Sequence, residues 1–333
     1  MLLKLKNPAG MKALVLNGVK SFSLLDRPLP VPGEGEVLMR VAAAAICRTD
    51  AKMWASGHRD LVLPRILGHE VVGSLREDPG RLYAVWPGTA CGNCSACRQG
   101  RQNLCREMRI TGFHRDGGFA GFMAVPRTSL VAVPDGLPAS TAALAEPLAC
   151  AVHAVRQAAI ASGERVLIYG GGTLGHLLGL ACAERGARVG MIDPDKEKLH
   201  RGRGLRLRRG ISVEDHSGAD AGQVDVALNA TSSPDAFMAG VGRLKPGGRF
   251  CLFSGLGGAA GDMHRLIDEL HYRELLFVGS YGCTAEDMRE ALRLLSKSGD
   301  DLRFLIERTI ALDEVPSAME RVLAGKGFRL VVA

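Results

Sequence analysis

No apolar run in the sequence approaches the roughly 20 residues that a membrane-spanning helix needs. The opening residues MLLKLKNPAG also lack the apolar core and the small-residue cleavage site of a secretory signal. These absences predict a cytoplasmic protein that has no membrane partner. A start at Met11 would be natural, so the preceding residues are either an extension or the product of a misplaced start codon.

Acidic residues are missing from one stretch, HRGRGLRLRRG, in a chain whose net charge is +7. Basic runs can bind nucleic acid, but this one contains no aromatic residue that could stack on bases. We therefore expect a solvated helix or loop face and no nucleic-acid partner. The arginines of the run are Arg201, Arg203, Arg206, Arg208 and Arg209.

The pattern of secondary structure changes near residue 150. Residues 1–150 read as short strands punctuated by Gly and Pro, which is typical of a mostly β domain. After a helical stretch at 151–163, a buried strand (164–170), a helix (171–187) and another strand (188–193) form a βαβ unit, which predicts a parallel sheet. Further strands are expected at 224–231, 247–255, 274–280 and 328–333, and amphipathic helices at 285–299 and 312–326. The chain, at 333 residues, has room for about two domains.

A G-x-G-x-x-G motif lies between that first buried strand and its helix. Its glycines permit a tight turn, a close approach of the backbone to a pyrophosphate, and close helix packing, while the helix N-terminus offers free N–H groups. An acid about twenty residues further on, at the end of the next strand, can accept from the ribose hydroxyls. The motif comprises Gly170, Gly172, Thr173, Leu174 and Gly175, and the acid is Asp193.

The Asp193 carboxylate would repel a 2′-phosphate, so the sequence predicts NAD rather than NADP. Arg201 and Arg203 could favour NADP, but they lie more than two helical turns beyond Asp193. A Rossmann-like core that binds no nucleotide is the remaining interpretation.

Two groups of residues have the composition of metal sites. The four cysteines of C-x2-C-x2-C-x7-C can close a tetrahedral shell around a structural zinc; an iron–sulfur cluster is the weaker alternative. A thiolate, an imidazole and one or two carboxylates would instead make a zinc site that stays open to substrate. The first group is Cys91, Cys94, Cys97 and Cys105, and the second is Cys47, His69, Glu70 and Glu146.

Together these motifs resemble the zinc-dependent medium-chain dehydrogenase/reductase family of alcohol, polyol and threonine dehydrogenases. The resemblance covers nearly the whole chain, from MKALVL, ICRTD and GHEVVG to EPLACAVHA, GGGTLG and RELLFVGSYG. It implies an α/β protein in which a GroES-like, mostly β catalytic domain (1–150 and 285–333) carries the zinc lobe at about 91–105. A doubly wound Rossmann domain (151–284) would bind NAD, and relatives form homodimers or homotetramers.

The resemblance also implies a set of catalytic residues. Cys47 and His69 would bind the catalytic zinc, and either Glu70 or Glu146 would be the third protein ligand. Asp50 would orient the zinc ligands.

Other roles follow from the same resemblance. Arg48 and Lys198 would contact the cofactor, and Thr49 would receive the proton of the alcohol as a hydride passes to the nicotinamide. Lys52 stands where the family often has a relay histidine, so the outer proton relay departs from the pattern. The segment between Glu70 and Cys91 is also short, which predicts a trimmed hairpin.

The expected function is therefore NAD-dependent oxidation of a secondary alcohol, such as a polyol, a sugar or a hydroxy-amino compound. Two alternatives from other classes remain. One is a catalytically silent family member that acts as a binding protein. The other is a nucleic-acid-binding protein in which the four cysteines hold a structural zinc. Trp54, Phe113 and His114 are either pocket residues or packing residues.

Overall fold

The structure is a computed structural model that describes residues 10–215, 223–257 and 263–333. The question of an extension before Met11 therefore falls almost wholly outside the described residues. The chain divides into two compact units. Unit 1 comprises Met1–Glu146, Thr284–Gly299 and Ile306–Ala333, and unit 2 comprises Pro147–Cys283 and Asp300–Leu305.

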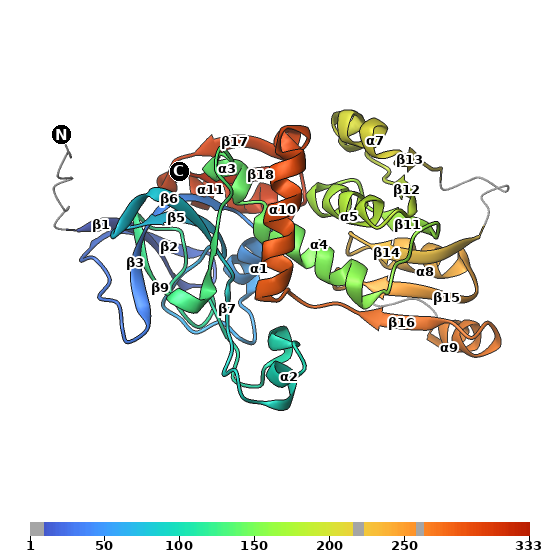
Figure 1. The fold of residues 1–333 in the computed structure, drawn as a ribbon, viewed down its shortest axis with the longest axis horizontal. Helices are drawn as coiled ribbons and strands as arrows, with labels where there is room; N and C mark the ends of the chain where they lie inside the picture. Colours follow the sequence, from blue (N-terminus) through green and yellow to red (C-terminus); the bar gives the residue numbers. More distant parts are fainter. Residues whose placement is uncertain (1–9, 216–222, 258–262) are drawn as a thin grey trace. The chain divides into compact units, whose positions relative to one another are not determined.

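Unit 1 is built on a seven-stranded sheet in the order β10-β6-β5-β3-β18-β17, with β9 also paired to β3. Smaller sheets, β2-β1-β4 and β7-β8, complete it (Figure 1). Its strands are β1 (Met11–Gly18), β2 (Ser21–Arg27), β3 (Glu36–Ala45), β4 (Arg65–Ile66), β5 (Glu70–Leu75), β6 (Asp78–Val85), β7 (Gly88–Thr89), β8 (Arg109–Ile110), β9 (Phe122–Pro126), β10 (Leu130–Ala132), β17 (Ile306–Ile310) and β18 (Arg329–Val332). The helices are α1 (Arg48–Ser56), α2 (Ser95–Arg98), α3 (Ala139–Ala142), most of α10 (Ala285–Leu302) and α11 (Val315–Leu323).

The middle of this sheet brings distant parts of the sequence together. Strand β3 pairs antiparallel with β5 on one side and with β18 on the other. Apolar side chains of β1 and β3, such as Leu14, Leu16 and Met39, belong to a core that also takes in Leu330 of β18. Strands β5 and β6 are joined by only Arg76 and Glu77, in agreement with the trimmed hairpin expected there.

Unit 2 is a six-stranded parallel sheet in the order β13-β12-β11-β14-β15-β16. This is the order of a doubly wound dinucleotide-binding fold, in which ligands bind at the carboxyl ends of the strands where the chain reverses direction. Its strands are β11 (Arg165–Tyr169), β12 (Arg188–Ile192), β13 (Ser212–Val213), β14 (Val224–Asn229), β15 (Leu244–Leu252) and β16 (Leu276–Gly279).

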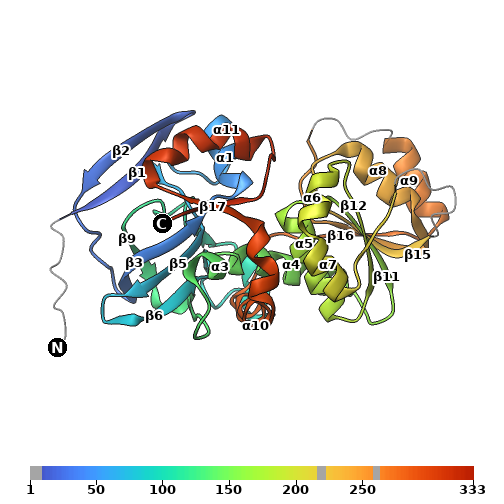
Figure 2. The same ribbon diagram turned by 90° about the horizontal axis from the view of Figure 1, so that it is seen from above.

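Helices cover both faces of this sheet, with α5 and α7 on one face and α8 and α9 on the other (Figure 2). The helices are α4 (Ala145–Gln157, of which Ala145 and Glu146 belong to unit 1), α5 (Thr173–Glu184), α6 (Lys196–Arg201), α7 (Arg203–Arg209), α8 (Pro234–Gly242) and α9 (Met263–Tyr272). Among the described residues, no helix is long and apolar enough to cross a membrane.

The arginine run forms two short helices that meet at Gly202. Arg203 and Arg208 are exposed, as expected of a solvated face. Arg206 is an exception, because it is buried and donates to the carbonyl of Leu199 at 2.9 Å. The prediction of a solvated face is therefore wrong for Arg206, which contributes to the packing of α6 against α7.

Candidate metal centres and glycine loop

Cys47, His69 and Glu70 come together in unit 1, with one ligand atom of each lying within 4.8 Å of the others. The pairing of β3 with β5 explains this, since Ala45 lies opposite Glu70 in the register. Cys47 follows β3 as the N-cap of α1, and His69 directly precedes β5. A thiolate, an imidazole and a carboxylate in this arrangement are a donor set that suits zinc.

Asp50 holds two of these residues in place. One carboxylate oxygen accepts from the backbone N–H of Cys47 at 2.9 Å, and the other lies 3.2 Å from Nδ1 of His69. Asp50 is completely buried. With Nδ1 engaged by a carboxylate, Nε2 of His69 is the nitrogen that can bind a metal, as is typical of histidine ligands with an outer carboxylate.

Arg329 is a site residue that the sequence analysis missed. It forms an ion pair with Oε1 of Glu70 at 2.6 Å, and its guanidinium lies 3.9 Å from Sγ of Cys47. The signal was an arginine in an otherwise apolar last strand, because arginine is rarely buried unless it is paired. Oε2 of Glu70 is buried and has no hydrogen-bond partner among the described residues. A cation at this oxygen would satisfy it.

The charges around Cys47 favour its thiolate. Burial opposes ionisation, but Arg329 and the hydrogen bond with His69 outweigh it and lower the pKa of Cys47 to about 7. The thiolate is the form that binds metals. Burial raises the pKa of Glu70 well above its usual range, despite the opposing charge of Arg329. A buried carboxylate of this kind gains from a bound metal ion.

The other predicted residues of unit 1 have different surroundings. Glu146 is buried and lies close enough to Glu70 that its charge contributes to raising the pKa of Glu70. Arg48 donates to the carbonyl of Leu323 at 3.0 Å, and Thr49 is half-buried in the first turn of α1. Lys52, on the same helix, is exposed.

Phe113 belongs to the core of unit 1, where it is 5% exposed. Its ring meets the imidazole of His69 edge-on, with the centroids 5.7 Å apart. Trp54 is buried in the same core. His114 accepts from the backbone N–H of Ile110 at 3.1 Å. Of these three candidates for a pocket, Phe113 is the one that contacts a predicted zinc ligand.

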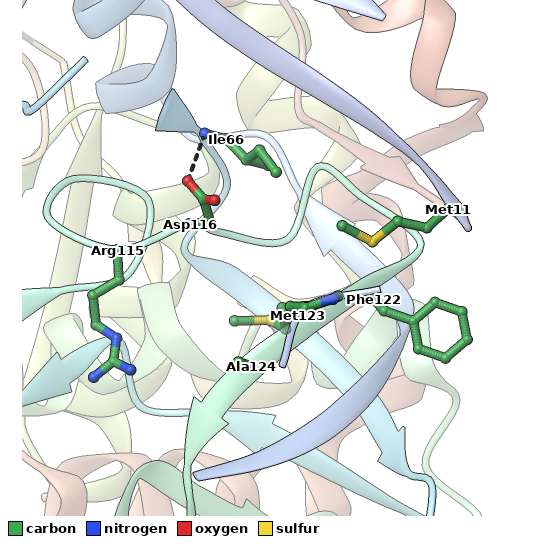
Figure 3. A pocket seen from close by; sticks show the side chains of 8 residues that line it. Met11, Ile66, Arg115, Asp116, Phe122, Met123 and Ala124 are labelled. Atoms are coloured by element: carbon green, nitrogen blue, oxygen red, sulfur yellow. Dashed lines mark hydrogen bonds between the residues drawn. The ribbon is translucent and has the colours of Figure 1, made fainter. Parts of the chain in front are cut away.

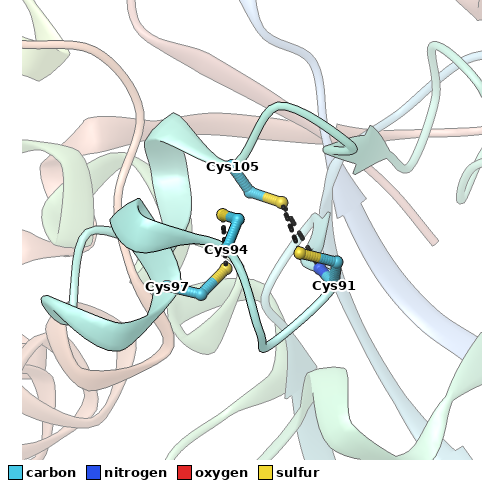
Figure 4. A group of neighbouring side chains, drawn as sticks. All are labelled: Cys91, Cys94, Cys97 and Cys105. Atoms are coloured by element: carbon cyan, nitrogen blue, oxygen red, sulfur yellow. Dashed lines mark hydrogen bonds between the residues drawn. The ribbon is translucent and has the colours of Figure 1, made fainter.

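The four cysteines of the lobe converge on one point, with all four sulfur atoms within 4.8 Å of one another (Figure 4). The Sγ atoms of Cys94 and Cys97, and those of Cys91 and Cys105, are 3.5 Å apart, which is too far for a disulfide. A tetrahedral zinc with bonds of about 2.3 Å would place its sulfur ligands about 3.8 Å apart. The lobe therefore fits a closed tetrahedral site.

The thiols of the lobe differ in how readily they ionise, because burial and the thiol of Cys94 raise the pKa of Cys97 to about 12. The backbone N–H of Cys97 is the main cause that lowers the pKa of Cys94 to about 6. This thiol can therefore ionise near neutral pH, which metal binding requires.

The glycine motif of unit 2 lies where β11 ends and α5 begins. Gly170 has a φ of +115°, and a Cβ at this position would lie 2.9 Å from the carbonyl oxygen of Ala230. A Cβ on Gly175 would collide with the carbonyl of Gly170. The space around Gly172 is open, so a ligand can approach the backbone there. The α5 helix then begins at Thr173 and includes Leu174.

Asp193 follows β12 and is joined to the glycine loop. Its carboxylate accepts from the backbone N–H of Gly171 at 2.6 Å and from that of Asp195 at 2.8 Å. Asp195 caps α6 and lies 3.9 Å from the ammonium group of Lys198. These contacts hold the acid beside the loop, and its recognition of a ribose stays a prediction.

A cavity of about 200 Å³ elsewhere in unit 1 contains none of the predicted site residues (Figure 3). Its lining is mainly apolar and includes Met11, Phe122 and Met123. The two charged residues that line it are both paired, Arg115 with Glu36 and Asp116 with Arg65. The predicted chemistry is therefore not located in this cavity.

Comparison with known proteins agrees with this geometry. Residues 33–135 match the family model "Alcohol dehydrogenase GroES-like domain". The chain is 32% identical to L-galactonate-5-dehydrogenase of Escherichia coli (strain K12), covering 86% of this chain and 88% of the relative. It is 28% identical to L-threonine 3-dehydrogenase of Edwardsiella ictaluri (strain 93-146), covering 97% and 99%.

A similar solved structure is that of a protein from Sinorhizobium meliloti 1021, described as a zinc-binding dehydrogenase and bound to NADP. It has a TM-score of 0.86 and 30% identity, and the match covers 98% of this chain and 99% of that one. The relatives are dehydrogenases that act on alcohols, and their fold combines the two kinds of unit described above. The chain therefore belongs to the zinc-dependent medium-chain dehydrogenase/reductase family and is an oxidoreductase of alcohols.

Proposed function

We propose that this protein transfers a hydride between a secondary alcohol and NAD at a zinc site in unit 1. The observation that carries the proposal is the buried group of Cys47, His69 and Glu70, whose ligand atoms lie within 4.8 Å of one another. A purely structural cluster would not need a carboxylate oxygen that lacks a hydrogen-bond partner, as Oε2 of Glu70 does among the described residues.

In this proposal Cys47, His69 and Glu70 hold the catalytic zinc, and Glu146 contributes a second buried negative charge nearby. When bound, zinc supplies Lewis acidity toward the oxygen of the alcohol. Asp50 keeps the imidazole of His69 in its ligating orientation. Thr49, half-buried in the first turn of α1, offers a hydroxyl that can take up the proton of the alcohol. The four cysteines of the lobe hold a structural zinc.

The choice of NAD over NADP rests on Asp193. Its two oxygens are fixed by the backbone N–H groups of Gly171 and Asp195, and each keeps a lone pair for a ribose hydroxyl. A fixed carboxylate disfavours a 2′-phosphate. Of the two arginines that could offset this charge, Arg201 donates to the carbonyl of Phe304, and Arg203 is exposed on α7.

The test is formation of NADH by the zinc-loaded protein with secondary alcohols, polyols, sugar acids and threonine, with NADP in parallel. We expect turnover of a polyhydroxylated or hydroxy-amino substrate, with kcat/KM for NAD exceeding that for NADP by at least about tenfold. A clear preference for NADP would overturn the proposed role of Asp193, but it would not contradict the proposed zinc-dependent hydride transfer. If the protein binds NADH but turns over none of these substrates, the result would favour a catalytically silent family member that acts as a binding protein.

A nucleic-acid binder is disfavoured by the partners of the arginine run. Arg208 pairs with Asp301 at 2.6 Å, and Arg209 lies 3.7 Å from Glu184. The positive charges of these two arginines are therefore partly balanced by carboxylates of unit 2. Binding to DNA or RNA that weakens steeply with salt would restore this alternative.

We further propose that the protein forms a homodimer through strand β16, and that a tetramer would be a pair of such dimers. This strand is one edge of the sheet in unit 2, and an edge strand can pair with a second copy across a two-fold axis. Large apolar side chains are exposed on it and on the neighbouring helix α9. They are Leu276 (57% exposed), Ile267 (57%) and Tyr272 (80%).

Leu276→Lys is therefore expected to convert the dimer to monomers at micromolar concentration, because it places two like charges in the proposed interface. Light scattering during size-exclusion chromatography measures the change. Leu207→Lys is the matched control, since Leu207 is 68% exposed on α7 of the same unit. An unchanged mass for Leu276→Lys, or an equal loss in the control, would contradict the proposed interface.

We also propose a cytoplasmic location. None of the nine cysteines forms a disulfide in the structure, and eight of them are either proposed metal ligands or buried packing residues. A reducing compartment preserves this state.

A further inference from the structure

The glycine loop is held at two of its peptide groups by side chains. The Gly170–Gly171 peptide donates its N–H to Asp193 at 2.6 Å. The carbonyl of Gly172 lies 3.0 Å from Nδ1 of His176 and also accepts from the backbone N–H of His176 at 3.1 Å. Since a carbonyl only accepts, the first of these contacts requires the proton on Nδ1 of the imidazole.

The carbonyl of Gly172 and the N–H of Thr173 belong to the same peptide plane and point in opposite directions. Fixing that carbonyl toward His176 therefore aims the N–H of Thr173 outward from the start of α5. This N–H is one of the free donors with which a helix N-terminus binds a pyrophosphate. Between these two held peptides, a Cβ on Gly172 would meet no atom within 4 Å, so the loop is open there.

We propose that His176 is a positioning residue for the dinucleotide, acting through the Gly172–Thr173 peptide. This inference rests on the proposed binding of a nicotinamide dinucleotide at the loop. In it, Asp193 and His176 hold the first and the last peptide of the loop, so that the N–H groups are oriented before the ligand arrives. Pre-orientation of this kind lowers the cost of binding.

The surroundings of His176 keep its ring in one place. The side chain is completely buried, and its ring meets that of Phe304 edge-on at 5.0 Å. A Cβ on Gly202, where α6 gives way to α7, would collide with Nε2. The break between these helices therefore supplies the space that the imidazole occupies.

The ring is also held in its neutral form. Burial lowers the pKa of His176 to about 4, and the positive charge of Arg206 acts in the same direction, whereas Asp193 and the carbonyl of Gly172 oppose them. At neutral pH the imidazole thus carries a single proton. That proton is the one shared with Gly172.

The test compares NADH affinity, measured by fluorescence titration, in His176→Leu and His176→Asn. Leucine removes the donor and keeps an apolar side chain, whereas the asparagine amide can place an N–H near the position of Nδ1. We expect His176→Leu to raise the Kd of NADH by about threefold to tenfold, the usual loss for one hydrogen bond. The KM for NAD should rise by a similar factor with little change in kcat, and His176→Asn should recover most of the affinity.

His200→Leu is the matched control, because His200 is exposed on α6 of the same unit. It should bind NADH as the wild type does. Equal affinity in wild type and His176→Leu would overturn the role of His176. The role would also be overturned if His176→Leu and His176→Asn lost NADH affinity equally and in proportion to the fall in their melting temperatures. Such a result would indicate that the side chain contributes only packing. A wild-type protein that fails to bind NADH would instead overturn the proposed function.

The contact with Gly202 gives an independent second measurement. Gly202→Ala should displace the imidazole and weaken NADH binding, but the same change in a His176→Ala background should add no further loss. Double-mutant cycles detect such coupling between residues in contact. Additive losses in the two backgrounds would contradict a link from Gly202 through His176 to the loop.

Discussion

Cys47→Ala is expected to lower kcat/KM by at least about 10³-fold. The proposed site loses a charged zinc ligand, and a bound metal stabilises the transition state by several kcal/mol. The fold should persist, since Asp50 bonds to the backbone N–H of Cys47 and not to its side chain. NADH affinity should also persist, because the glycine loop belongs to unit 2. Steady-state kinetics, zinc content and NADH titration measure these effects, and the zinc content should fall by about one ion per chain.

Cys182→Ala is the control for this variant. Cys182 is buried on α5 and belongs to neither proposed metal site. Its replacement should leave both zinc content and turnover close to those of the wild type. Substantial turnover by Cys47→Ala would remove Cys47 from the catalytic site.

Cys97→Ala should have the opposite profile, with a large loss of stability and a smaller effect on chemistry. The lobe contains only the short helix α2, the 3₁₀ turn Gln102–Leu104 and connecting loops, so little besides a metal can hold it together. A loss of about 3 kcal/mol would lower the melting temperature by roughly 6–12 °C. Zinc content should again fall by about one ion per chain.

Calorimetry and limited proteolysis between residues 91 and 105 would measure this effect. Ser95→Ala, within the same lobe but outside the cysteine cluster, is the control. A Cys97→Ala protein with unchanged zinc content and melting temperature would count against a structural metal.

The parts of the fold that the sequence predicted correctly depend on local patterns. The unit β11-α5-β12 is one example, because the glycines, the buried strands and the helix lie within about 30 residues and each supports the others. The cysteine lobe is another, since its four donors lie within fifteen residues. Such features can be predicted without knowing which residues far apart in the sequence contact one another.

The features that were missed depend on residues far apart in the sequence. Arg329 meets Glu70 only because β18 pairs with β3, and no local pattern indicates that pairing. The helix break at Gly202 likewise leaves room for the imidazole of His176, which belongs to a different helix, α5. The sequence offered both Glu70 and Glu146 as the third ligand, because nothing local distinguishes two carboxylates; the grouping of Glu70 with Cys47 and His69 depends on the pairing of β3 with β5.

The position of β18 has a consequence for the order in which the protein can take up metal. Arg329 is separated by 282 residues from Cys47 and by 259 from Glu70, and a ribosome adding about 5–20 residues per second would need roughly 15–60 s to cover that interval. The cysteine lobe can therefore acquire its ion while translation continues. In the cluster of Cys47, His69 and Glu70, by contrast, the Glu70 carboxylate does not gain its Arg329 partner until β18 has emerged and paired with β3. A nascent chain interrupted before that point would already contain all the proposed metal ligands, but the buried carboxylate of Glu70 would lack its arginine partner.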